Sequence, residues 1–276
     1  MRRLKISIVL QTLLALFLTE AIAIASLFFF RPEMALTVAM PGLTVSQFVV
    51  GLLVATAFLF LLMKFFHGRF LFELIFSLSL FGGIWFLSSL FFPGSTAILA
   101  ASFFTLARFF VPYVMAQNII MILGLAGVAV ALGVATAWPS LLWILIILSV
   151  YDIIAVYETK HMVTMFRGLV ERGVIFALIL PERWQALFTH VRNVKPGEGF
   201  SFLGSGDLAL PAIFVVSAFV SRPILGIGAA IGSLAGLFFT DLIFVWGRKR
   251  PMPALPPIAL GTIIGFFLAM FLTKFI

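Results

Sequence analysis

Acidic residues within or at the ends of long apolar runs are the first candidates for chemistry, because an ionised side chain is costly in hydrocarbon. This chain has six of them: Glu20, Glu73, Asp152, Glu158, Asp207 and Asp241. Two carboxyl groups held close together at low dielectric cannot both ionise, so they tend to share one proton. The ionised member can then activate water as a general base, while the protonated member hydrogen-bonds or protonates a scissile carbonyl. A facing pair would therefore favour peptide hydrolysis of the aspartic-protease type.

The same acids also fit functions of two other classes. Asp152, Asp207 and Asp241 could form the polar pathway of a cation channel or a proton-coupled transporter. A third reading is a membrane scaffold without catalytic activity. A hydrolytic pair needs only two acids, whereas a proton relay should also depend on Asp241 or Glu20.

Other kinds of catalytic site fit the sequence poorly. The chain has no Cys, which excludes a disulfide, a thiolate zinc site and a Cys nucleophile. An intramembrane serine protease needs a His in the membrane to activate its Ser, but the three His lie in or beside expected loops: His67, His161 and His190. No His-Glu-x-x-His zinc motif occurs. We therefore expect no metal and no organic cofactor.

Composition places these acids in a membrane protein. The chain has 276 residues, 63% of them hydrophobic, and its mean hydropathy is +1.24. Soluble domains do not reach such values. A helix needs about 20 apolar residues to cross the hydrocarbon core, so nine crossings would use about 180 residues, close to the number of apolar residues in this chain.

Apolar runs broken by charge, Pro and Gly predict an all-α polytopic membrane protein with nine transmembrane helices. Six helices precede one long connection and three follow it, which divides the chain into parts 1–158, 159–200 and 201–276. Gly residues with small-xxx-small spacing in the eighth helix favour close helix packing. The expected helices cover 6–30, 45–66, 70–92, 95–111, 114–136, 139–158, 202–221, 223–246 and 253–274.

The basic residues predict the orientation of these helices. With the N-terminus inside, fifteen of the 18 Lys and Arg fall on cytoplasmic segments, and only Arg31, Arg222 and Lys274 fall outside. This positive-inside bias predicts a cytoplasmic N-terminus and an external C-terminus. It also explains the net charge of +8 without a nucleic-acid partner.

The long connection is cytoplasmic in this arrangement. Its first part, 160–172, alternates charged and apolar residues at helical spacing and predicts an interfacial helix. The rest, around 195–199, is predicted to be a mobile loop.

Two of the acids are expected at the same depth. Asp152 lies six residues before Glu158, the cytoplasmic end of the sixth helix, and Asp207 lies six residues after Ser201, where the seventh helix should begin. At 1.5 Å per residue each would be roughly 9 Å from the same membrane face. Sequential helices are usually neighbours, so the two carboxyls could face each other.

Three short motifs, in order along the chain, carry a resemblance to a known family. They are Tyr151-Asp152 on the sixth helix, Gly204-Ser205-Gly206-Asp207 on the seventh and Pro253-Ala254-Leu255 at the start of the ninth. With the nine-helix layout, they make the chain resemble the presenilin and signal peptide peptidase family of intramembrane aspartyl proteases. The residue between the two Gly is Ser205 where Leu is commoner in the family.

The resemblance implies that Asp152 and Asp207 are the catalytic pair and that Asp241 lies outside the motifs. It implies that the substrates are transmembrane peptides held in the lipid bilayer. Whether copies of the chain form a homo-oligomer is left open. Pro211, one turn after Asp207, removes a helical hydrogen bond beside the acid. The expected substrate-binding residues are Tyr151, Gly204, Ser205, Gly206, Pro253, Ala254 and Leu255.

Overall fold

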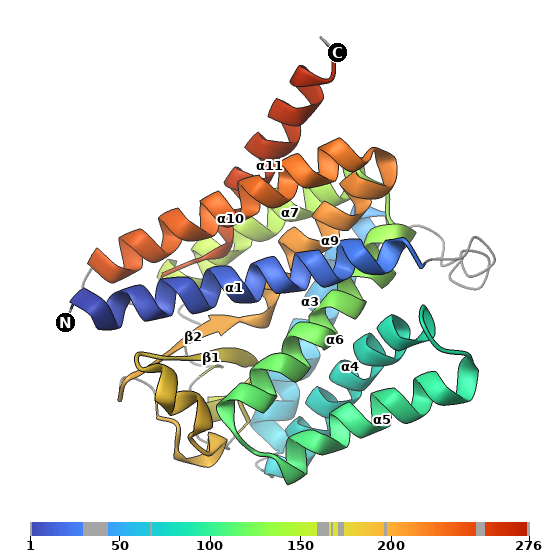
Figure 1. Ribbon diagram of the computed structural model, residues 1–276. Helices are drawn as coiled ribbons and strands as arrows, with labels where there is room; N and C mark the ends of the chain where they lie inside the picture. Colours follow the sequence, from blue (N-terminus) through green and yellow to red (C-terminus); the bar gives the residue numbers. More distant parts are fainter. Residues whose placement is uncertain are drawn as a thin grey trace.

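The structure is a computed structural model, and it describes residues 2–29, 44–66, 68–158, 166, 168–170, 174–195, 198–246 and 252–274. Long helices dominate these residues (Figure 1). Their bounds are α1 Arg2–Leu27, α3 Val45–Phe65, α4 Arg69–Ser89, α5 Gly94–Phe110, α6 Val114–Ala135, α7 Trp138–Ile153, α9 Ser205–Ser221, α10 Pro223–Trp246 and α11 Leu255–Leu272. A π-helical turn, Ile154–Glu158, extends α7.

A helix occupies each of the nine predicted ranges within the described part of the chain. Helices α5 and α9 have 17 residues each and are shorter than a usual crossing. Among the described residues, six helical segments are long and apolar enough to span a membrane: Ile6–Leu27, Arg69–Ser89, Val114–Ala135, Trp138–Glu158, Pro223–Phe244 and Leu255–Leu272. The chain is thus an integral membrane protein that crosses the bilayer several times.

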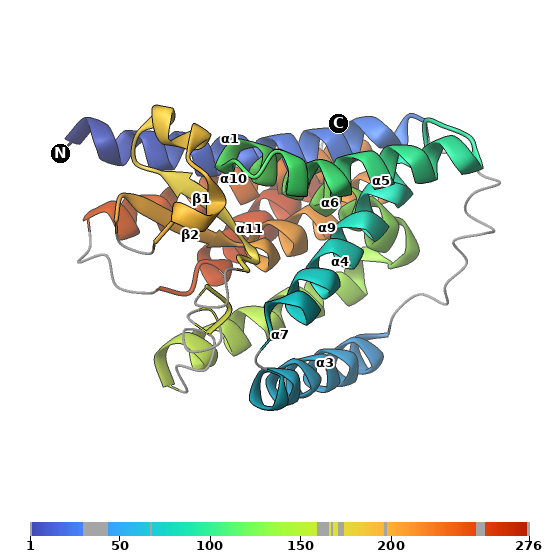
Figure 2. The same ribbon diagram turned by 90° about the horizontal axis from the view of Figure 1, so that it is seen from below.

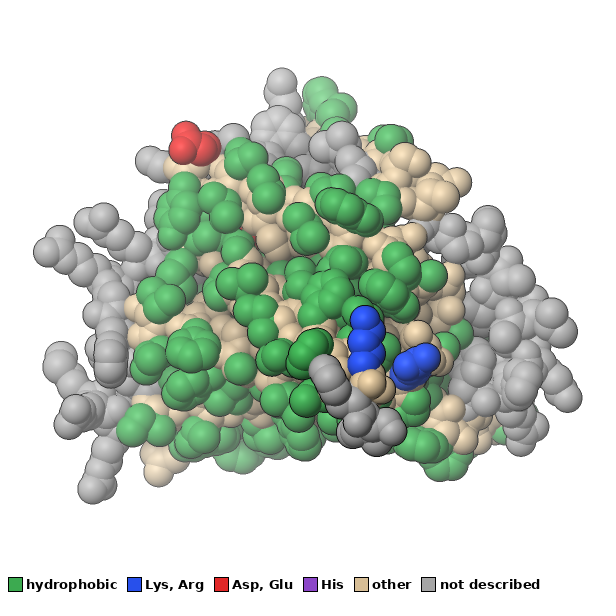
Figure 3. Space-filling model, turned by 90° about the horizontal axis from the view of Figure 1, so that it is seen from above, with side chains coloured by type: hydrophobic (Ala, Val, Ile, Leu, Met, Phe, Trp, Pro, Cys, Tyr) green, Lys and Arg blue, Asp and Glu red, His purple; other side chains and the backbone are tan. Residues whose placement is uncertain are grey.

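Large apolar side chains cover much of the outside of the helix bundle, as expected for a surface that faces lipid. Phe103 on α5, Ile231 on α10 and Leu268 on α11 are all exposed. Figure 3 shows one face on which hydrophobic side chains predominate and charged ones are few. A water-facing surface of this kind would be an aggregation site, whereas in a bilayer it is solvated by lipid tails.

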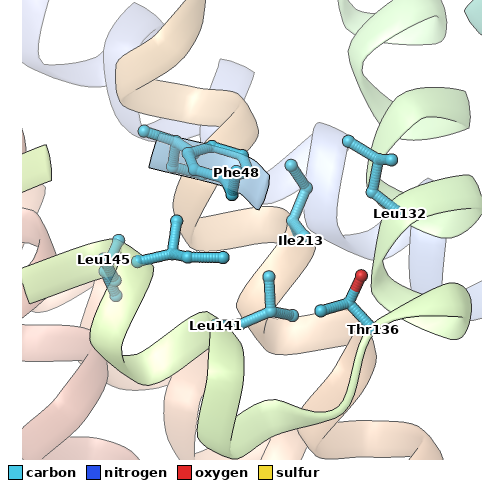
Figure 4. Close-up of a pocket in the computed structure, with 8 residues that line it drawn as sticks. Phe48, Leu132, Thr136, Leu141, Leu145 and Ile213 are labelled. Carbon is cyan, nitrogen blue, oxygen red and sulfur yellow. The ribbon is translucent and has the colours of Figure 1, made fainter. Parts of the chain in front are cut away.

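Helix α9 lies at the centre of the bundle. Its residues 211–218 are all buried, and it packs against α1, α6, α7, α10 and α11. A small apolar pocket separates its Ile213 from α3, α6 and α7, with Phe48 and Leu132 on other walls (Figure 4). The central position of α9 brings its N-terminal turn next to the C-terminal end of α7, where the acids of both helices lie.

The described residues around 195–199 have no helix or strand, but the part of the connection before them, also predicted as a loop, contains regular structure. Strand β1, Ala177–Pro181, pairs antiparallel with β2, Phe200–Gly204, with Ala177 opposite Gly204. Two 3-10 turns, Trp184–Phe188 and Val191–Asn193, lie between the strands. Both strands are short apolar or alternating runs bounded by Pro or Gly, a pattern that favours extended structure.

The hairpin also corrects two other predictions. The chain is not all-α, and its seventh helix begins at Ser205 instead of 202, because Phe202 and Leu203 belong to β2. Of the interfacial helix predicted at 160–172, only Phe166 and 168–170 are described, and these four residues are helical. The remainder of that prediction lies outside the described residues.

Helices α10 and α11 pack closely, in agreement with the close packing expected for the eighth helix. Gly232 faces Gly261, and Gly228 faces Gly265, so that backbone touches backbone. A Cβ added to Gly232 would overlap the carbonyl oxygen of Gly261. Since neither atom is the end of a flexible side chain, the helices themselves would have to separate.

We therefore expect Gly232→Ala to destabilise the protein, lowering its Tm in detergent by roughly 5 °C, the effect of overpacking by about 1–3 kcal/mol. Gly82 on α4 is the matched control, because a Cβ added there meets nothing within 4 Å. Gly82→Ala should leave the Tm unchanged or raise it, since Gly is costly inside a helix. Equal Tm values for the two variants would contradict the close packing of α10 and α11.

Candidate active site

Asp152 lies at the end of the regular α-helical part of α7. Its side chain is buried, with 7% of its surface exposed. The backbone N–H of Leu255, at the start of α11, donates a hydrogen bond to Asp152 Oδ2 at 3.3 Å. The π-helical turn that follows widens the helix immediately after the acid, and such turns are frequent at functional sites.

Asp207 lies in the first turn of α9, three residues after the N-cap Gly204. The backbone N–H of Gly204 donates a hydrogen bond to the Asp207 carboxyl group. This is half of a capping box, in which an acidic side chain satisfies the free N–H at the helix start. The local sequence therefore fixes where the Asp207 side chain points.

The two carboxyl groups lie within electrostatic range of each other. This agrees with their expected common depth, although the reason differs from the one the sequence suggested. Asp207 is in the first turn of its helix and not six residues along it, because β2 replaces the expected first turn. Asp152 and Asp207 thus both lie where regular α-helix meets another backbone conformation.

The Gly-Ser-Gly segment lies directly against Asp207. A Cβ added to Gly204 would be 2.9 Å from Asp207 Oδ2 and 3.6 Å from its Cγ, so only Gly leaves room for this carboxyl position. A Cβ added to Gly206 meets nothing within 4 Å, and Gly206 is exposed. Ser205 is half-buried between them. The absence of a side chain at Gly204 therefore permits the observed position of the Asp207 carboxyl group, while Gly206 leaves open space beside it.

Pro211 is buried inside α9, four residues after Asp207. Since Pro has no N–H, it cannot donate the usual helical hydrogen bond to the carbonyl of Asp207. The backbone at the acid is thereby less constrained than in a regular helix.

The Pro-Ala-Leu segment reaches Asp152 through its main chain. Met252–Ala254 have no regular structure, and α11 begins at Leu255, whose N–H holds Asp152. Pro253 is buried and Ala254 is half-buried. The N–H of Leu255 is thus a main-chain group of this segment that lies beside the acid. Tyr151 is half-buried beside Asp152 on the next position of α7.

The other acids have partners elsewhere in the bundle. Glu20 accepts a 2.7 Å hydrogen bond from Ser233 Oγ, which links α1 to α10. Asp241 accepts one from Thr12 Oγ1 and links the same two helices. Glu73 forms ion pairs with two Arg. The fold brings Asp152 and Asp207 together and holds these three acids in separate contacts.

Among the described residues, no three His, Asp or Glu side chains lie close enough together to hold a metal ion. The site instead consists of two carboxyl groups and the backbone N–H groups that hydrogen-bond them. These N–H contacts were not deducible in detail from the motifs, since a backbone donor leaves no mark on residue type.

The fold is thus a bundle of long apolar helices in which the carboxyl groups of Asp152 and Asp207 lie within electrostatic range of each other. The family model described as signal-peptide peptidase and presenilin aspartyl protease matches residues 6–275. The chain therefore belongs to this family, and it is an aspartic endopeptidase that cleaves within the membrane. The channel and transporter alternative is not favoured.

Solved structures of presenilin-family intramembrane aspartate proteases resemble the chain over nearly its whole length. One, in space group C222, has a TM-score of 0.66 and 26% identity, covering 96% of this chain and 99% of that chain. Another, in space group P2, has a TM-score of 0.60 and 27% identity, covering 95% and 97%. No curated protein sequence matches the chain.

Proposed function

We propose that Asp152 and Asp207 are the catalytic pair of this protease and that they cleave peptide bonds of transmembrane segments. The observation that carries the proposal is the meeting of two carboxyl groups from different helices, each held by one backbone N–H. In the singly protonated pair, the carboxylate takes a proton from water as the oxygen attacks the scissile carbonyl carbon. The acid hydrogen-bonds that carbonyl, and a proton then passes to the leaving nitrogen as the C–N bond breaks.

The residues around the pair suit an unwound substrate. A helical peptide bond is shielded by its own hydrogen bonds, so the substrate must open locally before water can attack. Tyr151, Ser205 and Gly206 lie beside the acids in sequence, and the exposed Gly206 leaves space next to Asp207. We assign these residues and Pro253-Ala254-Leu255 to the substrate path.

The direct test is incubation of the purified protein with a single-span peptide substrate, with and without a peptidic transition-state mimic of aspartic proteases. The cleavage rate should pass through a maximum as pH rises. The doubly protonated pair lacks a base and the doubly ionised pair lacks an acid, so only intermediate pH supplies both. The two apparent pKa values of this profile belong to the pair and not to one residue. A rate that climbs steadily to alkaline pH, in protein that stays folded, would contradict a shared proton.

We also propose nine crossings with a cytoplasmic N-terminus and an external C-terminus. The fifteen-to-three distribution of Lys and Arg supports this orientation. Gln11 on α1 donates a 2.9 Å hydrogen bond to the carbonyl of Pro181, so the N-terminal part of α1 and the β1–β2 hairpin share one end of the bundle (Figures 1 and 2). The positive net charge is then explained by the membrane topology, and we expect no nucleic-acid partner.

Cysteine labelling tests this orientation cleanly because the chain has no Cys of its own. Lys195 is 70% exposed and lies between the two strands of the hairpin. In intact cells, a membrane-impermeant thiol reagent should not reach Lys195→Cys until the membrane is opened. Labelling of this variant from the outside of sealed cells would reverse the proposed topology.

A further inference from the structure

A second polar site lies away from the two aspartates, at the end of the bundle where α4 and α6 begin and α5 ends. It is a cavity of about 270 Å³. The N-terminal turns of α4 and α6 line it, and the segment between β1 and β2 covers it. Its polar side chains are Arg69, Glu73, Arg108, Tyr113, Gln117, His190 and Arg192.

The buried wall of this cavity is an ion cluster. Arg69 Nε donates to Glu73 Oε2 at 2.7 Å, and Arg108 Nη2 donates to Glu73 Oε1 at 3.1 Å and to Ser77 Oγ at 3.3 Å. Arg108 also stacks over the ring of Phe76 at 4.7 Å. One carboxylate therefore holds two guanidinium groups in place.

The contacts of Arg108 with Glu73 and Ser77 do not satisfy all of its hydrogen-bond donors. It is only 8% exposed, and an Arg is rarely so buried without complete pairing. Its Nε–H is buried and has no acceptor among the described residues. Arg108 also lines the open cavity, so its positive charge lies at the cavity wall.

The cover of the cavity is fixed in place by the backbone. Val114 N–H donates to Thr189 O at 3.1 Å, and Val191 N–H donates to Pro112 O at 2.8 Å. These bonds place His190 against Tyr113, with their ring centroids 6.5 Å apart. They also place the exposed Arg192 at the rim of the cavity.

We propose that this cavity binds a phosphate group, carried by an anionic lipid headgroup or by free inorganic phosphate. Among the described lining residues, three Arg oppose one Glu, so the cavity has excess positive charge. The starts of α4 and α6 add the positive ends of two helix dipoles. The guanidinium fork matches phosphate oxygens. The cavity also lies at the ends of apolar helices, where basic pockets meet lipid headgroups.

The test uses the full-length protein in detergent, washed free of lipid. Its Tm is measured while short-chain phosphatidylglycerol, short-chain phosphatidylcholine or inorganic phosphate is added at constant ionic strength. Ligand that binds only the folded protein raises the Tm with concentration. We expect phosphatidylglycerol, phosphate or both to raise it, and phosphatidylcholine to have no comparable effect. A response to phosphatidylglycerol alone identifies a lipid, and a response to phosphate identifies the free anion.

Arg192→Gln is the informative variant, because Arg192 is exposed and its removal leaves the Glu73 cluster intact. It should raise the Kd of the active ligand about tenfold, the loss expected for one charge-assisted hydrogen bond. Arg183→Gln is the matched control, since Arg183 lies exposed on the same segment but does not line the cavity. Equal responses to the two lipids, no response to any ligand, or equal Kd values in the two variants would overturn the proposal.

Discussion

Replacing either Asp152 or Asp207 with Asn is expected to abolish cleavage while the protein stays folded. Each acid has its own part in the proposed mechanism, so losing one should lower the rate roughly a thousand-fold or more. Folding should survive because the Asn carbonyl oxygen can still accept the hydrogen bonds from Leu255 N–H and Gly204 N–H. The measurement is cleavage of a single-span peptide by each purified variant, with the Tm as the check on folding.

Asp241→Asn is the control for this pair. Asp241 is buried in the same bundle, and its Asn variant can still accept the hydrogen bond from Thr12. It should therefore keep measurable activity, because it belongs to none of the three motifs. Turnover by a folded Asp152→Asn or Asp207→Asn protein would refute the assignment. Loss of activity in a folded Asp241→Asn protein would instead add Asp241 to the site.

Gly204→Ala should cause the next largest loss. The new Cβ would be 2.9 Å from Asp207 Oδ2, too close for any real contact, so the carboxyl group must turn away. A misplacement of about 1 Å in a catalytic group can lower the rate by a factor of about 100. We expect kcat to fall by about 10–100-fold with little change in Tm.

Gly206→Ala separates this effect from a general sensitivity of the motif. Its Cβ would meet no atom within 4 Å, so the position of Asp207 should not change. Because Gly206 leaves space on the proposed substrate path, its variant should raise KM and leave kcat near that of the original protein. The same fall in kcat for both variants would show that the Cβ contact with Asp207 is not the cause.

The elements that the sequence predicts well are those formed by contacts along the chain. In the part of the chain that the structure describes, the apolar runs form helices close to the expected ranges, because hydropathy and helical hydrogen bonds act within about 20 residues. The Gly residues of the eighth run predict close packing of that helix, since a residue without a side chain allows a neighbouring helix to come near. The structure identifies the neighbour as α11.

The β1–β2 hairpin could not be predicted from contacts along the chain. Phe202 and Leu203 are as apolar as the helix that follows them, so hydropathy assigned them to that helix. Their partners in β1 are Ile179 and Leu178, more than twenty residues away in sequence. Strand pairing depends on that distant segment, and the sequence of one strand does not indicate which segment it pairs with.

The residue types alone made Asp152 and Asp207 candidates for catalysis, because an ionised carboxyl group is costly in an apolar segment and is usually retained for function. The motifs around these two residues then distinguish them from the other acids. Only the tertiary structure decided how they are held. The N–H of Leu255 reaches Asp152 across 103 residues of sequence, and the site around Arg108 joins α4 and α5 to a segment between the strands. Such contacts depend on how the helices pack, and packing is a property of the whole bundle that no single stretch of sequence contains.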